Sequence, residues 1–194
     1  MRNSIALIGA VLLLAACGGS STPSESSSSA APTEAAGAWA VSDCIQISPP
    51  TITPTQPLDS VEQGGVATTT AVGMAPTVGI SESATPATSL VTLDVVEGSG
   101  DAVAAGATVT VDYCGVGLDS GAIFDSSWSR GQPATFPLDG VIAGWQEGIP
   151  GMKPGGRRLL IIPGDLAYGP NPPPGSGIGP NETLVFVVDM LSSP

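Results

Sequence analysis

The stretch Asp139-Gly140-Val141-Ile142-Ala143-Gly144-Trp145-Gln146-Glu147-Gly148 predicts a short helix in a chain otherwise built from strands, turns and loops. Asp139 can cap this helix, because a carboxylate can accept hydrogen bonds from the N–H groups of the first turn. Val141, Trp145 and Ile149 recur at every fourth position and therefore share one face. A helix this short is marginal on its own. We therefore expect a sheet against which it packs, with Trp145 either as a core aromatic or as the floor of a pocket.

The segments on both sides of this stretch have the pattern of strands. In residues 108–115, Val109, Val111 and Tyr113 face one way, and the residues between them face the other. The segments predicted as strands are 90–96, 108–115, 122–126, 157–163 and 183–191. Several strands with one short helix predict an α+β domain at residues 89–194.

The N-terminus has the features of an export signal. Residues 5–16 are apolar, follow a short basic start, and are too few to form a stable membrane span. They end in Leu14-Ala15-Ala16-Cys17-Gly18, which resembles a bacterial lipobox, where the peptidase cuts before the Cys and its thiol carries diacylglycerol. The alternative is an ordinary secretory signal with a coincidental Cys. We predict a signal peptide at residues 1–16 and a lipid anchor on Cys17, with palmitate among its acyl chains, at the extracytoplasmic side of the cell membrane.

Two segments separate this signal from the domain. Residues 17–38 are rich in Ser and have almost no large apolar side chains, so we expect a flexible tether. Residues 39–88 contain short apolar pieces separated by Gly and Pro. This segment is either a partly ordered β arm of the domain or a second tether. Trp39 and Cys44 are unusual in a pure linker and favour the arm.

The composition excludes several kinds of chemistry. The chain has no histidine, which rules out a Ser-His-Asp triad and any His-ligated metal, and we expect neither a metal nor a cofactor. The net charge of −12 argues against nucleic acid as a partner. Cys44 and Cys114 form either a disulfide or two free thiols. Arg157 and Arg158 indicate a solvated face with one structural salt bridge.

Most aromatic residues of the chain fall within the predicted domain. The aromatic and aliphatic candidates for a pocket are Tyr113, Phe124, Phe136, Val141, Ile142, Trp145, Tyr168, Ile178 and Phe186. Asp125 and Arg130 are the polar groups near them in sequence, although Asp125 could instead be a turn residue bonded to Ser127. An apolar pocket with few polar groups suits an uncharged ligand or a reaction with little proton transfer.

The ordered motifs of this domain resemble FKBP-type peptidyl-prolyl isomerases. The first are Val111-Asp112-Tyr113-Cys114-Gly115 and Gly121-Ala122-Ile123-Phe124-Asp125-Ser126-Ser127. Next come Val141-Ile142-x-Gly144-Trp145-x-Glu147-Gly148, Met152-x-x-Gly155, Arg157-Arg158, Ile162-Pro163, Leu166-Ala167-Tyr168-Gly169 and Thr183-Leu184-Val185-Phe186. Each motif alone is weak, but their order over residues 90–192 is specific. The resemblance fits a bacterial lipoprotein of the secreted actinobacterial kind.

The resemblance implies an antiparallel sheet of five to six strands wrapped around one short helix, with a pocket between them. It implies catalytic roles for Asp125 beside the bound amide, Tyr168 as a donor to a substrate carbonyl, and Tyr113. The residues that it implies for substrate binding are Phe124, Arg130, Phe136, Val141, Ile142, Trp145, Ile178 and Phe186. The Ile142 N–H would donate to ligand, and Arg130 would pair with Asp125. Ala134, where many members carry an aromatic residue, departs from the pattern and affects substrate preference.

The implied activity is rotation of X–Pro amides without a nucleophile or cofactor, which agrees with a chain that has no histidine. The expected partners are proline-containing unfolded or maturing exported polypeptides, together with macrolide inhibitors of the rapamycin type. The alternative is a non-catalytic chaperone or scaffold that uses the same pocket. Nothing in the sequence indicates an obligate oligomer, and we expect a monomer.

Overall fold

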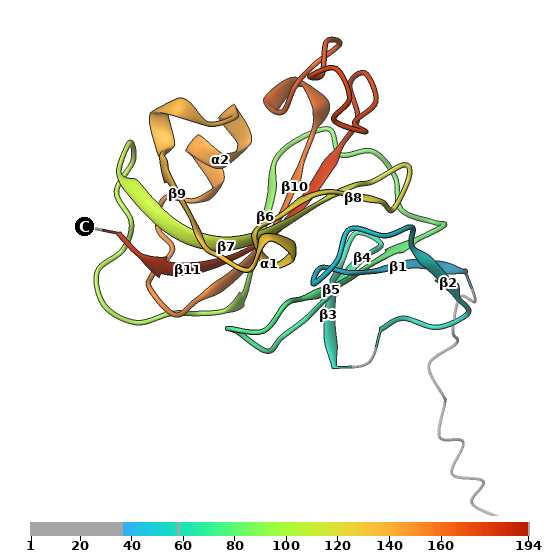
Figure 1. The fold of residues 1–194 in the computed structure, drawn as a ribbon, viewed down its shortest axis with the longest axis horizontal. Coiled ribbons are helices and arrows are strands. Elements are labelled where there is room, and N and C mark those ends of the chain that lie inside the picture. Colours follow the sequence, from blue (N-terminus) through green and yellow to red (C-terminus); the bar gives the residue numbers. More distant parts are fainter. Residues whose placement is uncertain (1–36, 58, 194) are drawn as a thin grey trace, which may run out of the picture. The chain divides into compact units, whose positions relative to one another are not determined.

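The computed structural model describes residues 37–57 and 59–193, which form two antiparallel sheets with short helices (Figure 1). The predicted signal peptide at residues 1–16, Cys17 and the tether as far as residue 36 lie outside these residues. Across the described ranges, no helix is long and apolar enough to cross a membrane.

The larger sheet has six strands in the order β6-β10-β11-β7-β8, with β9 paired to β7. Its strands are β6 (Val91–Val96), β7 (Thr108–Gly117), β8 (Ile123–Ser126), β9 (Ala134–Pro137), β10 (Arg157–Ile162) and β11 (Leu184–Ser192). Every pairing is antiparallel. The predicted α+β class and the sheet of five to six strands are confirmed.

The predicted helix is shorter than expected and its predicted cap is wrong. A 3-10 turn, η1 (Leu138–Gly140), precedes the helix α2 (Ala143–Gly148), and Ile142 occupies the N-cap position without a side-chain bond. Leu138 is fully buried. Its N–H donates a hydrogen bond of 3.0 Å to the carbonyl oxygen of Ala107, the residue before β7. This anchor holds the chain in a turn, so Asp139 is exposed in η1 instead of capping the helix.

Two glycines let α2 lie close against β10. An added Cβ at Gly144 would be 2.3 Å from Ile162 Cγ2, and one at Gly148 would be 2.8 Å from Leu160 Cδ2. Arg158 of β10 donates from Nη1 to the carbonyl oxygen of Gly148 at 2.7 Å, at the last turn of the helix. Tertiary contact therefore stabilises a helix whose own glycine content disfavours it.

The described residues of the segment 39–88 contain a second sheet, in the order β2-β1-β5-β4-β3. Its strands are β1 (Trp39–Asp43), β2 (Thr51–Thr53), β3 (Ser60–Gln63), β4 (Val66–Thr69) and β5 (Thr77–Ser81). The larger sheet lies between α2 on one side and this smaller sheet on the other (Figure 1).

Each face of the larger sheet therefore contributes to a separate apolar cluster. Along β11, Phe186 and Val188 pack into the cluster that contains Trp145, whereas Val185 and Val187 pack into the cluster that contains Val66 of the smaller sheet. This division follows from the alternation of side chains along a strand. Burial on both faces explains why β10 and most of β11 have no exposed residue.

Two covalent or polar links join the sheets. Cys44 and Cys114 form a disulfide with a Cα–Cα distance of 5.9 Å. The prediction that Arg157 and Arg158 lie on a solvated face with one salt bridge is wrong, because both are buried and each has its own ion pair, Arg157 with Asp189 and Arg158 with Asp94. The Arg157 side chain is fully buried. The Arg157 guanidinium pairs with Asp189 at 2.6 Å. It also donates to the carbonyl oxygen of Thr69, at the end of β4, and to that of Met74, between β4 and β5. These contacts satisfy a buried charge, which would be costly without partners.

Candidate active site

A pocket of about 290 Å³ opens beside α2 on the side of the larger sheet away from the smaller sheet. Its lining residues are Tyr113, Phe124, Asp125, Phe136, Gly140, Val141, Ile142, Trp145, Tyr168 and Phe186. All three Phe and both Tyr of the chain belong to this set. The pocket is therefore where the aromatic side chains of the chain are concentrated.

Trp145 of α2 forms the floor of the pocket. It is 3% exposed, and its ring meets those of Tyr113, Phe136 and Phe186 edge-on at centroid distances of 5.5, 5.7 and 5.4 Å. Aromatic rings at these distances and angles attract one another beyond their buried area. The walls hold the indole in one orientation, which makes it a rigid surface for a flat or cyclic apolar group.

A glycine on β7 makes room for one wall. A Cβ at Gly115 would lie 2.5 Å from Phe124 Cζ and 2.9 Å from Phe186 Cε1. These two rings meet edge-on at 5.4 Å in the space above the glycine. The absence of a side chain at Gly115 therefore determines where both walls stand.

The polar groups of the pocket form a connected set at its edge. The Tyr113 hydroxyl donates to Asp125 Oδ2 and accepts from Arg130 Nη2 at 2.9 Å. The Arg130 guanidinium also pairs with the Asp125 carboxylate and lies 5.4 Å from the centroid of the Tyr113 ring. Burial and the hydrogen bond to Asp125 raise the pKa of Tyr113 to about 12. The three side chains thus hold one another in place with the tyrosine protonated.

Tyr168 lines the pocket and lies two residues after the 3-10 turn η2 (Gly164–Leu166). Burial, followed by the charge of Asp125, raises the pKa of its hydroxyl above the ordinary value, so the hydroxyl keeps its proton at neutral pH. Its side chain is 37% exposed. A half-exposed hydroxyl at the mouth of an apolar pocket can donate to a carbonyl oxygen of a bound molecule.

The structure brings nine of the eleven candidate residues into the lining of one pocket. Arg130 contacts the pocket through Asp125 and Tyr113, and it comes from the four-residue helix α1 (Ser127–Arg130). Ile178 packs against the apolar cluster around Trp145 but does not line the pocket. Gly140 lines it and was not among the candidates. The sequence signal for Gly140 would have been its place in the turn just before Val141.

The alternative interpretation of Asp125 as a turn residue bonded to Ser127 is wrong. The Ser127 hydroxyl donates to Asp112 Oδ1 at 2.8 Å and accepts from the Tyr113 N–H at 2.9 Å. Asp125 instead points its oxygens at Tyr113 and Arg130. Ser127 therefore fixes the backbone on which the tyrosine is carried.

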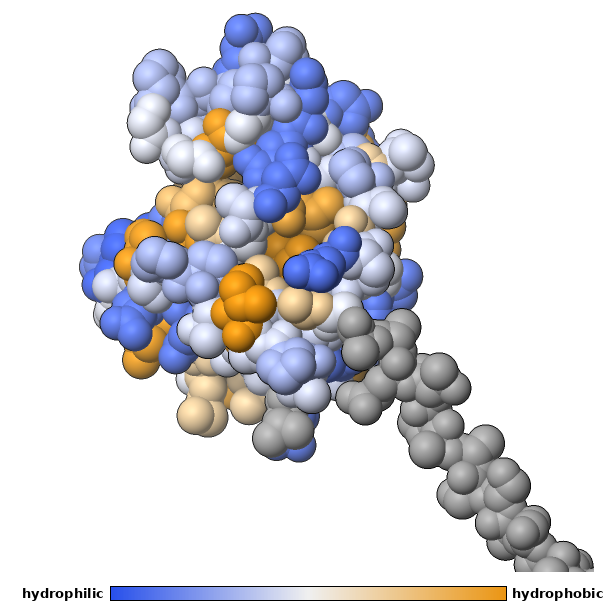
Figure 2. Space-filling model, turned by 90° about the vertical axis from the view of Figure 1, so that its right-hand side faces the viewer, coloured by the Kyte–Doolittle hydropathy of each residue, from blue (hydrophilic) through white to orange (hydrophobic). Residues whose placement is uncertain are grey.

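A second hollow of about 370 Å³ lies between β1–β2 and the turn after β7. Small and aliphatic residues such as Ala40, Ile52 and Leu118 line it, with acidic groups of Glu82 and Asp119 and no aromatic ring. Figure 2 shows the face on the side of β2, where hydrophobic patches are interrupted by hydrophilic residues. Within the described ranges, no group of three His, Cys, Asp or Glu side chains could hold a metal ion. The aromatic pocket is therefore the stronger candidate.

Comparison with known proteins agrees with this choice. The family model of the FKBP-type peptidyl-prolyl cis-trans isomerases matches residues 100–191. A probable FK506-binding protein of Corynebacterium glutamicum is 53% identical over 105 residues, which cover 54% of this chain and 86% of the relative. An FK506-binding protein of Streptomyces anulatus is 49% identical over 109 residues, covering 55% of this chain and 88% of the relative.

A solved structure is similar in fold to about half of the chain. The crystal structure of FkpA from Escherichia coli aligns with a TM-score of 0.50 and 46% identity, covering 56% of this chain and 50% of that one. The fold, the aromatic pocket and these identities lead to one conclusion. The chain belongs to the FKBP-type peptidyl-prolyl cis-trans isomerase family, and it is an enzyme of that activity.

Proposed function

We propose that this isomerase rotates X–Pro bonds of unfolded or maturing exported polypeptides in the pocket above Trp145. The observation that supports this proposal most strongly is the aromatic floor and walls with one connected polar edge, which consists of Asp125, Tyr113 and Arg130. A proline ring is apolar and flat enough for such a floor, and the adjacent amide requires few polar contacts.

The chemistry of the X–Pro bond explains why an apolar pocket with few polar groups is sufficient for catalysis. Rotation about an X–Pro amide breaks resonance, with a barrier of ~18–20 kcal/mol, and the uncatalysed exchange takes on the order of tens to hundreds of seconds. The twisted amide has lost conjugation, so its carbonyl is less polar than in the planar form. An apolar pocket from which water is excluded favours the less polar state, and a pocket shaped to the twisted form adds further stabilisation.

The polar side chains would position the amide. The Tyr168 hydroxyl and the Ile142 N–H would donate to carbonyl oxygens of the bound chain, and Asp125 would lie beside the amide that rotates. Phe124, Phe136, Val141 and Phe186 would surround the proline ring. The same surface would accept the cyclic apolar core of FK506 or rapamycin, since two of the relatives are named for FK506 binding.

The N-terminal sequence and the disulfide support a location outside the cytoplasm. A disulfide such as Cys44–Cys114 persists in oxidising compartments. We propose that Cys17 carries a lipid that attaches the enzyme as a monomer to the outer side of the cell membrane. Replacement of Cys17 by Ser should release the protein from the membrane fraction, and retention of the variant on membranes would contradict the lipid anchor.

Refolding of a proline-limited protein tests the proposed substrate. A small secreted protein with a slow phase set by X–Pro isomerisation should refold faster with catalytic amounts of the full chain, and rapamycin should remove the acceleration. Asp125→Val should lose most of the effect. Acceleration of a short X–Pro peptide without acceleration of refolding would exclude unfolded polypeptides as substrates. Binding of both without any acceleration would instead indicate a chaperone or scaffold.

A further inference from the structure

Cys44, the residue directly after β1 of the smaller sheet, contacts β7 and β8, the strands that carry Tyr113 and Asp125. Its sulfur is bonded to Cys114 on β7, and its carbonyl accepts from the Ser126 hydroxyl on β8 at 2.7 Å. Cys114 and Ser126 are opposite each other in the β7–β8 pairing. We propose that the smaller sheet, through Cys44, holds the polar edge of the active site in register, and that Ser126 is a positioning residue.

The alternation of a strand explains how this contact reaches the pocket. Cys114 and Ser126 are fully buried, and Cys114 belongs to the cluster shared with the smaller sheet. Their chain neighbours Tyr113 and Asp125 line the pocket. Consecutive side chains of a strand point to opposite faces. Cys44 therefore contacts each strand at the residue next to a polar pocket residue, Cys114 next to Tyr113 and Ser126 next to Asp125.

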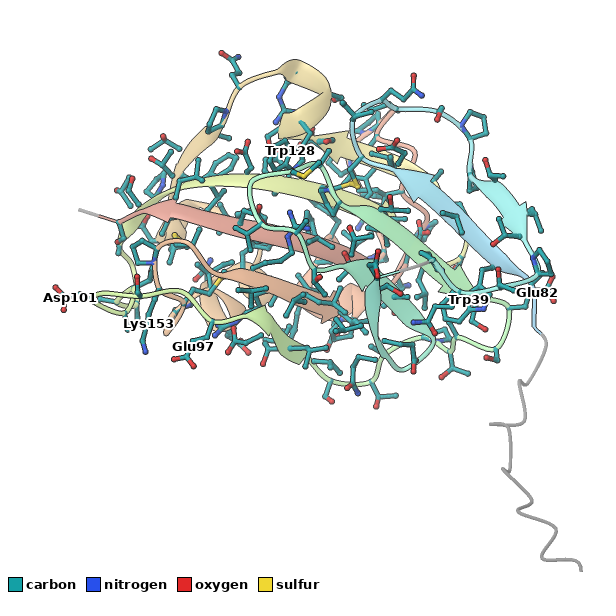
Figure 3. The ribbon with its side chains drawn as sticks, turned by 90° about the horizontal axis from the view of Figure 1, so that it is seen from below. Trp39, Glu82, Glu97, Asp101, Trp128 and Lys153 are labelled. Atoms are coloured by element: carbon teal, nitrogen blue, oxygen red, sulfur yellow. A yellow bond between two sulfur atoms is a disulfide. The ribbon has the colours of Figure 1, made fainter. Side chains whose placement is uncertain are left out.

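Ser126 also begins the helix that carries the third polar group. Its hydroxyl oxygen accepts from the Ser129 N–H at 3.3 Å and caps α1 while it donates to Cys44. Trp128 of this helix packs against the apolar cluster that includes the disulfide, and Figure 3 shows its side chain beside the two sulfur atoms. Arg130 follows at the end of α1 and reaches back to Asp125.

The polar edge needs this support because its own ion pair is exposed. The side chains of Arg130 and Asp125 are 41% and 40% exposed, and exposed ion pairs contribute little rigidity on their own. Small displacements of positioned groups reduce catalysis strongly, by as much as ~100-fold for a misplacement of about 1 Å. Fixing Ser126 and its partner Cys114 therefore holds the geometry of Asp125 and Tyr113, the residues next to them.

A matched pair of serine variants tests the proposal, which rests on the role proposed above for Asp125. Ser126→Ala removes the bond to Cys44, and Ser42→Ala removes a similar buried bond of 2.6 Å from the smaller sheet to the Gly121 carbonyl, at the far end of the same hairpin. Both are made in the full chain, and kcat/KM for an X–Pro peptide is measured where circular dichroism shows equal folding. We expect a loss of about tenfold for Ser126→Ala and less than about twofold for Ser42→Ala.

The pH at which the Tyr113 hydroxyl titrates is a second measurement, and a loss of stability alone would not change it. In a Tyr168→Phe background, Tyr113 is the sole tyrosine, and its hydrogen bond to Asp125 contributes to its raised pKa. Ser126→Ala should move this titration toward lower pH, and Ser42→Ala should not. If Ser126→Ala does not fold, the pair Cys44→Ala with Cys114→Ala replaces it under the same criteria.

The outcomes separate the two proposals. Equal kcat/KM for the Ser126→Ala and Ser42→Ala variants, or an unmoved Tyr113 titration in Ser126→Ala, would overturn the positioning role while leaving the isomerase function intact. A wild-type chain without turnover would overturn the proposed function itself.

Discussion

Arg157 Nε lies 2.6 Å from Asp189 Oδ1, and both side chains are buried where the larger sheet meets the segment that joins β4 to β5. The guanidinium also donates to the carbonyl oxygens of Thr69 and Met74 at 3.0 and 2.6 Å, and Asp189 Oδ2 accepts from the Gly73 N–H. The charged pair is therefore satisfied by the smaller sheet. The two sheets complete one another in polar as well as in apolar contacts.

Arg157→Ala should lower the free energy of unfolding by about 3–5 kcal/mol, because it leaves the Asp189 charge buried without its partner. Urea denaturation followed by tryptophan fluorescence measures the change. The control is Lys153→Ala, which removes an ion pair with Glu97 at the exposed position labelled in Figure 3. That variant should change stability little. Similar losses for both variants would contradict the structural role of the buried pair.

Gly144→Ala should destabilise the protein although alanine favours helices. In an exposed helix the change would gain up to about 1 kcal/mol, but here the new Cβ would lie 2.3 Å from Ile162 Cγ2. We expect a loss of about 1–3 kcal/mol from overpacking. Gly140→Ala is the control, since its Cβ would meet only Pro137 Cγ at an ordinary 3.6 Å. A stabilised Gly144→Ala variant would show that α2 does not depend on close approach to β10.

The helix α2 and the strands around it show what local rules of sequence can predict. The existence of the helix and the strands followed from apolar periodicity, and β7 alternates as expected, with Val109 and Val111 on the side of Trp145. The predicted cap at Asp139 failed, because burial of Leu138 determined where the helix could begin. A tertiary contact of this kind cannot be recognised from the spacing of apolar residues in the stretch 139–148.

The ordered motif identified the residues that meet in the pocket, but the order of the smaller sheet was harder to foresee. Its strands are three to five residues long and are separated by Gly and Pro. A usable signal existed in β10 and β11, where Leu159, Ile161, Val185 and Val187 make the second face of the larger sheet apolar. Such a face requires a cover. The burial of Arg157 could not be foreseen, because its backbone acceptors are more than 80 residues away in sequence.

Trp145→Ala should weaken ligand binding as well as stability, because the indole is both core and pocket floor. A loss of about 3–5 kcal/mol in unfolding free energy is typical of such a truncation. Met190→Ala is the comparison, since Met190 is fully buried in the same cluster but does not line the pocket. Calorimetric titration with rapamycin on folded protein should show weaker binding for Trp145→Ala alone. Equal affinity for both variants would make Trp145 a core residue only.

The pH dependence of turnover should be flat from about pH 6 to 9. The chain has no histidine, and both pocket tyrosines have a raised pKa. Peptide turnover measured across this range checks the prediction, and an inflection near neutral pH would show that an unassigned group titrates.

Stability should fall at alkaline pH through Tyr113. Its pKa is raised from 10.0 to about 12 in the folded protein, so the unfolded chain loses this proton first as the pH rises. The folded state then binds more protons, and the contribution of Tyr113 to stability is complete below pH ~10 and is lost between pH ~10 and ~12. Denaturation curves of wild type and Tyr113→Phe at several alkaline pH values should show a shallower decline for the variant. Parallel declines would contradict the raised pKa.

The exchange rate between the cis and trans forms of a short X–Pro peptide, measured by NMR exchange spectroscopy with catalytic amounts of the full chain, tests the central claim most directly. The account predicts rapid exchange with wild type, loss of most of this acceleration in Asp125→Val, a smaller loss in Tyr168→Phe, and complete inhibition by rapamycin. Exchange no faster than in the peptide alone, or acceleration that persists in Asp125→Val and in the presence of rapamycin, would contradict catalysis in this pocket.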